Sequence, residues 1–168
     1  MAESKKKASS RAADELKRNE KKWSPELMRA GWTVFPSVIL ERQQAFPLDA
    51  IDINILLHLA RHWWYSENPP FPSKRVIAEC MGISTSTVQR RIARMERDGL
   101  IERVERYSPG VGRQTNAYLF DGLIEKSKPF AAESVAAREE KKAEAAARRR
   151  RKRPRPPRAN GTDEGGAQ

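Results

Sequence analysis

The sequence predicts an α+β fold that is mostly helical and carries one small β-hairpin. Between residues 48 and 99 apolar residues recur at helical spacing in three successive stretches, and each stretch begins beside a residue that can cap a helix. After Gly99, two short alternating runs flank a loop that contains Pro109 and Gly110, which is the pattern of a hairpin. A length of 168 residues allows one modest core with extensions.

The chain begins with a charged segment, and a short helix follows it. Residues 1–22 are polar, and we expect them to form a mobile basic arm. Pro25 suits the first turn of a helix that starts after Ser24, and Gly31 can end that helix.

Two further short elements precede the main helices. The strand formers of residues 32–35 predict an edge strand beside the hairpin. Residues 36–44 predict another helix start, with three inward-facing candidates, Val38, Ile39 and Leu40. We expect these short segments to pack against the core.

Residues 48–65 give the strongest helical pattern in the chain. Asp49 caps or charges the start of this helix. A wide apolar face follows, made by Ile51, Ile55, Leu56, Leu59 and Trp63. Three prolines in residues 66–72 cannot continue the helix, so we expect a scaffold helix that ends there.

Two capped helices follow, at residues 73–82 and 84–99. Ser73 and Ser84 can each accept an orphan backbone N–H, and Gly99 can close the second helix in a left-handed conformation. A buried stripe on the second helix is predicted at Val88, Ile92 and Met95. The core is expected to join Ile55, Leu59, Ile77, Val88, Ile92 and Leu100.

The outward face of the second helix carries side chains that can hydrogen-bond to nucleic acid. Four of them, Thr85, Ser86, Gln89 and Arg90, suit base edges, with the two hydroxyls also suited to phosphate or a thymine methyl. Arg94 and Arg97 suit phosphate, and Lys74 is a further candidate. A solvated amphipathic surface helix is the alternative.

The spacing of small and apolar residues around the turn is that of a tight helix crossing. Ala78 stands four residues before Gly82, and the apolar plugs Ile83 and Val88 follow at one and six. This looks like the helix-turn-helix motif. With the hairpin, residues 48–120 resemble the winged helix-turn-helix family. Arg91 departs from the pattern, because many members carry an aliphatic residue there.

The hairpin forms the wing of that resemblance. Its strands are predicted at residues 101–106 and 115–120, with the tip at 107–114. Arg113 on the tip is the candidate to enter a minor groove or grip phosphate, and a solvated loop arginine is the alternative. Residues 122–128 predict a short closing helix, limited by Pro129, so the domain spans residues 23–130, with the motif at 73–99 and the wing at 100–120.

Positive charge is concentrated towards the ends of the chain. Residues 1–22 hold eight Lys and Arg against four Asp and Glu, residues 23–130 fourteen against twelve, and residues 131–168 eleven against six. Residues 131–153 are rich in helix formers but poor in large apolar residues, which predicts an exposed helix before a disordered basic tail. Nonspecific phosphate contacts are expected from Arg148, Arg149, Arg150, Arg151, Lys152 and Arg153. A solubilising tail and a nuclear import signal are the alternatives.

Enzyme and metal chemistry have no motif in this sequence. No phosphate-binding loop or nucleophile elbow occurs, so neither catalytic residues nor cofactors are predicted. His58 and His62 are spaced for a shared metal, but no third ligand is nearby, and helix histidines without metal are favoured. Cys80, the sole cysteine, is expected to be a small buried hydrophobe.

The resemblance implies sequence-specific binding of double-stranded DNA, as in a bacterial transcription regulator. A plasmid or phage replication initiator, or another accessory DNA-binding protein, is one alternative, and a winged protein or RNA interaction module is another. No stretch approaches the ~20 apolar residues of a membrane span, and residues 1–22 lack the apolar region of a secretory signal. A cytoplasmic, nucleoid-associated protein without membrane contact is therefore expected, with homodimerisation left open.

Overall fold

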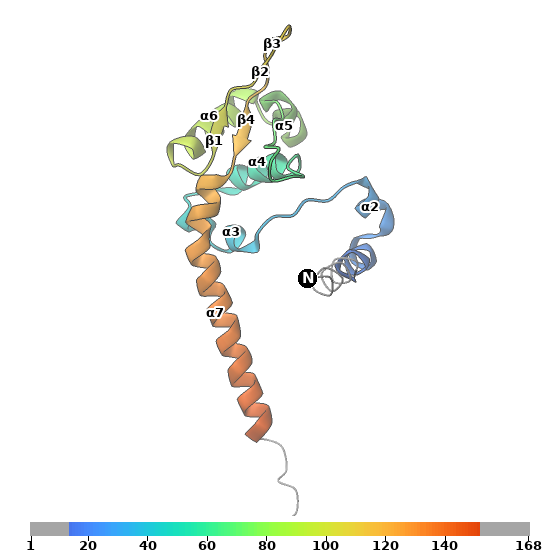
Figure 1. Cartoon of the computed structure of the whole chain (residues 1–168), viewed down its shortest axis with the longest axis vertical. Coiled ribbons are helices and arrows are strands. Elements are labelled where there is room, and N and C mark those ends of the chain that lie inside the picture. Colours follow the sequence, from blue (N-terminus) through green and yellow to red (C-terminus); the bar gives the residue numbers. More distant parts are fainter. Residues whose placement is uncertain (1–13, 152–168) are drawn as a thin grey trace, which may run out of the picture. The chain divides into compact units, whose positions relative to one another are not determined.

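A computed structural model describes residues 14–151 of the chain, with side chains up to residue 149. The chain divides after Lys128 into two units. Figure 1 shows the helices and strands along the chain. A helical stretch over residues 14–23 comes first. The elements that follow are α2 (Pro25–Ala30), α3 (Ser37–Glu41), the 3₁₀ helix η1 (Gln43–Ala45), α4 (Ala50–Ala60), α5 (Lys74–Met81), α6 (Thr85–Arg97), β1 (Glu102–Val104), β2 (Tyr107–Ser108), β3 (Gly112–Arg113), β4 (Ala117–Leu119) and α7 (Asp121–Arg151).

The caps of α5 and α6 are those that the sequence predicts. The Ser73 hydroxyl accepts the Val76 N–H at 3.2 Å, and the Ser84 hydroxyl accepts the Thr87 N–H at 3.2 Å. Between the helices Gly82 adopts a left-handed conformation, with φ at 65°. These local signals fix the helix-turn-helix geometry.

Helix α4 begins as predicted but ends earlier than the sequence indicates. Its start is a reciprocal capping box in which Asp49 accepts the Asp52 N–H at 3.1 Å and donates its own N–H to Asp52 Oδ2 at 2.9 Å. The helix ends at Ala60, not near residue 65. Trp63 then leaves the helical path and stacks on Phe120, with ring centroids 5.2 Å apart.

The core is the one that the apolar stripes predict. All six expected residues are at most 2% exposed: Ile55, Leu59, Ile77, Val88, Ile92 and Leu100. It also includes Phe46 and Leu48 before α4, Tyr118 in β4 and Leu123 in the first turn of α7. Helices α4, α5 and α6 contact one another, and these four residues complete the core that the helices form.

The wing is a hairpin, and its outer part is more ordered than predicted. Strand β1 pairs antiparallel with β4, with Val104 opposite Ala117. The predicted strands end at residue 106 and begin again at 115, but β2 and β3 also pair within the tip, with Tyr107 opposite Arg113. Gly110 and Gly112 adopt positive φ, which suits the tight turn.

Residues 32–35 do not form the expected edge strand. The loop that contains Pro70 and Phe71 lies beside β4 instead. The Tyr118 N–H donates to the Pro70 carbonyl at 2.9 Å, and the Thr115 hydroxyl donates to the Phe71 carbonyl at 2.9 Å. Residues 32–35 are instead extended, and Val34 is 73% exposed. The strand prediction failed because strand propensity cannot identify which segment reaches a sheet edge.

Two further predicted side-chain positions need correction. Ile39 of α3 is buried, but Leu40 is exposed, so α3 turns less of its apolar surface inward than expected. Cys80 is exposed rather than buried. The buried residues of α5 are Ile77 and Ala78, and Cys80 lies on the solvent-facing side of the helix.

The start of α7 is tied to the end of α6. The Leu123 N–H donates to the Leu100 carbonyl at 2.8 Å, and a Cβ built on Gly122 would lie 2.2 Å from the Gly99 carbonyl oxygen. The helix was expected to stop at Pro129 but runs on to Arg151, because the Ala-rich sequence that follows favours helix. From residue 135 to 149 all side chains are exposed, as predicted for this segment.

Candidate nucleic-acid interface

The N-terminal half of α6 presents a group of polar side chains to solvent. Four of the predicted base contacts are exposed there: Thr85, Ser86, Gln89 and Arg90. The first turn of α6 contains no acidic residue, and the same holds for α5. Both helix N-termini therefore keep their partial positive charge, which favours a phosphate beside them.

Lys74 and Gln89 are brought together across the motif. Lys74 is the first residue of α5, and its ammonium donates to Gln89 Oε1 at 3.3 Å. The two predicted contact residues thus lie on one surface although they come from different helices. This bond leaves the Gln89 NH₂ group available as a donor.

Arg94 does not lie on the outward face, which corrects the expectation from helical spacing. Its guanidinium donates to the Pro47 carbonyl at 3.0 Å and pairs with Asp52, a carboxylate that is fully buried. Arg91 likewise pairs with Asp49 and lies 3.7 Å from Asp52. We call this group of Asp49, Asp52, Arg91 and Arg94 the α4–α6 clamp.

The electrostatics of the clamp differ between its two carboxylates. Burial raises the pKa of Asp52 above its ordinary value. Burial also acts to raise the pKa of Asp49, but the hydrogen bonds of the capping box and Arg91 outweigh it and lower that pKa. The ion pairs of Arg91 with Asp49 and of Arg94 with Asp52 hold α6 against the start of α4.

The clamp was missed because sequence reasoning assigned each arginine by the periodicity of its own helix. A signal was present in matched spacings. The two acids are three residues apart at the start of one helix, and the two arginines are three residues apart on another. Such matched pairs can face each other across a helix crossing.

Arg97 and the wing make up the rest of the predicted cationic surface. Arg97 is exposed and forms no ion pair within the described residues. Its neighbour Glu96 accepts Arg103 Nε at 2.8 Å, which joins α6 to β1, and this hydrogen bond from Arg103 lowers the pKa of Glu96.

The predicted wing contact, Arg113, lies in β3 rather than in a loop. Its guanidinium pairs with Glu105 at 2.6 Å, and both side chains are well exposed. Arg106 lies over the Phe71 ring, 3.7 Å from its centroid. The exposed Arg113 pair can open at little cost, because a pair between exposed side chains contributes little to stability.

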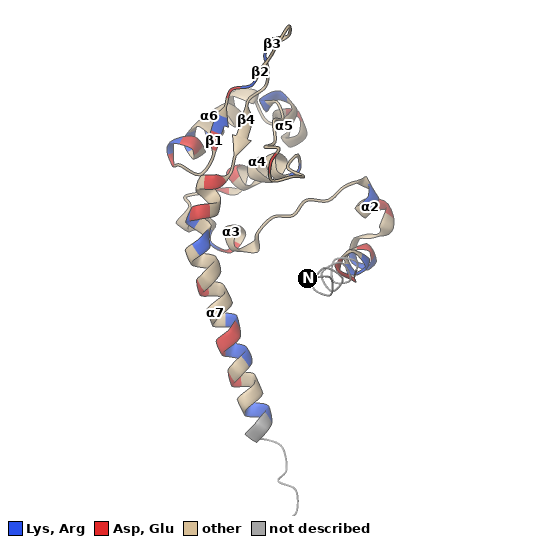
Figure 2. Cartoon of the chain, viewed as in Figure 1, with Lys and Arg blue, Asp and Glu red and all other residues tan. Residues whose placement is uncertain are grey.

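The predicted nonspecific contacts, residues 148–153, belong to the second unit. Arg148 and Arg149 are exposed on α7, where Lys and Arg alternate with Glu (Figure 2). Arg150 and Arg151 are helical, but their side chains lie outside the described residues. Lys152 and Arg153 also lie outside them.

The described part of the chain offers neither a metal cluster nor a membrane span. It contains no group of three or more His, Cys, Asp or Glu that could hold a metal ion. Burial is the main cause that lowers the pKa of His58 and His62. Over residues 14–151, no helix combines the length and the apolar character needed to cross a bilayer.

One of the comparisons with known proteins identifies the helix-turn-helix segment. The model of a family described as a helix-turn-helix domain matches residues 48–101. Curated protein sequences give no match. A solved structure, the crystal structure of transcriptional regulator PA3341, is 24% identical, covers 72% of this chain and 76% of its own, and has a TM-score of 0.37, too low to establish a common fold. Residues 48–101 therefore match a helix-turn-helix domain, and the β1–β4 hairpin that follows gives the chain the architecture of a winged helix.

Proposed function

We propose that the protein binds double-stranded DNA in a sequence-specific manner, with the N-terminal half of α6 in the major groove. The observation that carries this proposal is the group Thr85, Ser86, Gln89 and Arg90, exposed together at an acid-free helix start. Hydroxyl, amide and guanidinium groups are the donors and acceptors that discriminate base edges. A helix that docked on protein would more often present an apolar patch.

The roles within the group follow from side-chain reach. Gln89 and Arg90 are long enough to reach base edges, with Arg90 suited to the two acceptors of guanine. Thr85 and Ser86 lie at the helix start, where they suit phosphate or a thymine methyl. Lys74 would meet phosphate after exchanging its bond to Gln89, and Arg97 and Arg113 would add contacts on either side.

The test compares Arg90→Ala with a matched loss of charge elsewhere. A preferred duplex would first be selected from randomised sequences. Arg90→Ala should then weaken binding to that duplex by about 1–3 kcal/mol and relax preference at one base pair. Arg29→Ala, which removes an exposed arginine from α2, is the control and should leave base preference unchanged. Equal weakening of the Arg90 variant on all sequences would make Arg90 a phosphate contact.

We further propose a role in bacterial transcription regulation. A replication initiator could use the same DNA-reading surface. Genome-wide crosslinking of the tagged protein separates these roles, because a regulator should give peaks at promoters and an initiator at an origin. A homodimer would appear as two half-sites about 10 base pairs apart.

The C-terminal basic run is proposed to add nonspecific affinity. Residues 131–168 carry eleven Lys and Arg against six Asp and Glu, whereas residues 23–130 carry fourteen against twelve. Removing residues 138–168 should make the fall of log affinity with log salt shallower by several units, at roughly 0.9 for each phosphate that the tail no longer neutralises. The preferred sequence should not change. If the truncated protein kept the full salt slope, a protein partner would explain the tail better.

A further inference from the structure

A second surface of the protein carries aromatic residues that the winged domain does not use. Residues 30–34 pass the C-terminal end of α4, and three adjoining hollows share Trp32 and Thr33 there. Their volumes are about 600, 360 and 230 Å³. We call them together the tryptophan groove.

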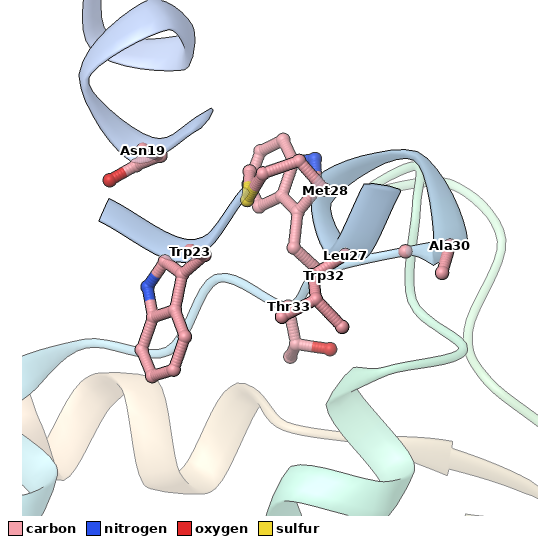
Figure 3. Close-up of a pocket in the computed structure, with 8 residues that line it drawn as sticks. Asn19, Trp23, Leu27, Met28, Ala30, Trp32 and Thr33 are labelled. Carbon is pink, nitrogen blue, oxygen red and sulfur yellow. The ribbon is translucent and has the colours of Figure 1, made fainter. Parts of the chain in front are cut away.

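The largest hollow is built entirely by residues 19–33. Figure 3 shows Trp23, Leu27, Met28 and Trp32 around it. Helix α2 buries none of its residues, and Trp23 and Leu27 are 59% and 58% exposed. Apolar area of this kind on a short helix indicates that something covers it.

The two smaller hollows bring this segment to the end of α4. They are lined by Trp32 on one side and by Arg61 and Trp64 on the other. Trp32 is 46% exposed and Trp64 is 65% exposed, whereas their neighbour Trp63 is occupied by its stack on Phe120. The indole faces of Trp32 and Trp64 are therefore accessible.

The charges of the groove are of one sign. Arg61 is exposed and forms no ion pair within the described residues, and no Asp or Glu is among the described residues that line the three hollows. Lys22 adds a cation at the rim, 5.6 Å from the centroid of the Trp23 ring. The groove is thus complementary to an anion that carries flat apolar groups.

We propose that the tryptophan groove binds single-stranded DNA, with bases stacked on Trp32 and Trp64 and a phosphate held by Arg61. Exposed aromatic faces beside unpaired cations are the combination that binds unpaired bases without reading their sequence. A groove for an apolar protein segment would be lined mainly by aliphatic side chains, whereas the hollows that join Trp32 to α4 contain Arg61, His62 and Thr33. The choice of DNA over RNA rests on the proposed function of the winged domain.

The groove is separate from the duplex-reading surface. It lies at the C-terminal end of α4, and the α4–α6 clamp holds the other end. The eleven residues of α4 span about 16 Å at 1.5 Å per residue. Substitutions in the groove should therefore leave duplex binding by α6 intact.

The test uses the full-length protein with two single strands of equal charge. One is oligothymidine of about 15 nucleotides, within the range of known single-strand sites, and the other is an abasic strand of the same length. Quenching of tryptophan fluorescence reports stacking. Oligothymidine should bind more tightly than the abasic strand, because the basic tail can grip the phosphates of both but the groove needs bases.

The variants locate the effect. Trp32→Ala and Trp64→Ala should each weaken oligothymidine binding by roughly 5- to 150-fold, the equivalent of about 1–3 kcal/mol per stacked base. Trp32→Phe should retain most of the affinity, and Tyr107→Ala, which removes an exposed aromatic from the wing, should have no effect. If Trp32→Ala fails to fold, Arg61→Glu replaces it and should weaken binding of both strands. Binding of the selected duplex should be unchanged throughout.

Several results would overturn the proposal. Equal affinity for the two strands would mean that the tail alone binds them, and unchanged affinity in both tryptophan variants would exclude the groove. A dimer in sedimentation that Trp32→Ala dissociates would make the groove an interface between copies of this chain. Tighter binding of oligouridine would overturn the choice of DNA. Failure of the duplex selection with oligothymidine binding intact would refute the proposed function and leave base stacking in the groove standing.

Discussion

The arginines of α6 fall into two pairs that do different work. Arg90 and Arg97 are exposed and form no ion pair within the described residues, whereas Arg91 and Arg94 are held by the carboxylates of the α4 capping box. All four count equally in the net charge of +11. Basic residues of α6 can thus be used to hold the helix in place, so a count of them overstates the charge that is free to bind an anion.

Substitution of Ile92 should give the largest effect. Its burial decides which face of α6 points inward, and so which arginines are exposed. Its side chain is fully buried. Truncation to Ala should cost about 4 kcal/mol of unfolding free energy, in the upper part of the range for a closed site. Urea denaturation measures this. A loss below about half a kcal/mol, the range of surface substitutions, would show that the faces of α6 are misassigned.

Asp52→Ala would break the clamp and leave Arg94 without its carboxylate. Breaking a buried ion pair from one side costs about 3–5 kcal/mol, and the partial exposure of Arg94 points to the lower end, about 3 kcal/mol. Combining it with Arg94→Met should recover part of the loss, because no unpaired charge then remains. If the single variant cost no more than the double variant, the clamp would not be holding α6.

Arg97→Ala tests the exposed pair of arginines. As an exposed cation it should contact phosphate, so its loss should weaken binding to the selected and a scrambled duplex alike. The salt slope should become shallower by about 0.9. Arg91→Ala is the matched control on the same helix and should leave the slope unchanged in protein that remains folded. A change of slope with Arg91 would place that side chain on DNA after all.

The smallest effect concerns the link between α6 and the wing. The hydrogen bond from Arg103 holds the pKa of Glu96 below its ordinary value of 4.5. Because the folded pKa is the lower one, this stabilisation is present above pH 4.5 and is lost as the pH falls through the folded pKa. Glu96→Gln should cost under about 1 kcal/mol at neutral pH and nothing at low pH. Thermal unfolding across that range would show the two proteins converging, and a constant difference would contradict this.

Local signals account for most of what the sequence predicted. The caps at Ser73, Ser84 and Asp49 and the stripe of Val88 and Ile92 depend on residues a few positions apart, and they are confirmed. A hydroxyl at a helix start or an apolar residue every third or fourth position acts through its own helix.

The predictions that failed depended on distant partners. Arg94 finds Asp52, which lies 42 positions earlier, and the edge of β4 is taken by Pro70 rather than by residues 32–35. Helical periodicity places a side chain on a face but cannot say whether another helix covers that face. For the candidate interface, helical periodicity predicted the exposed residues at the start of α6, whereas the loss of Arg94 to the clamp needs the spacing of two helices to be compared.

Gly122 sets a limit on how this sequence can vary. A side chain there would strike the backbone of residue 99 at 2.2 Å, and backbone cannot turn aside as a flexible side chain can. Gly82 is glycine for a different reason, its left-handed backbone, which asparagine can also adopt. In a population of functional variants position 82 should therefore drift between glycine and asparagine, while position 122 should stay invariant. The junction between α6 and α7 would then evolve more slowly than the α6 residues that we propose to read DNA.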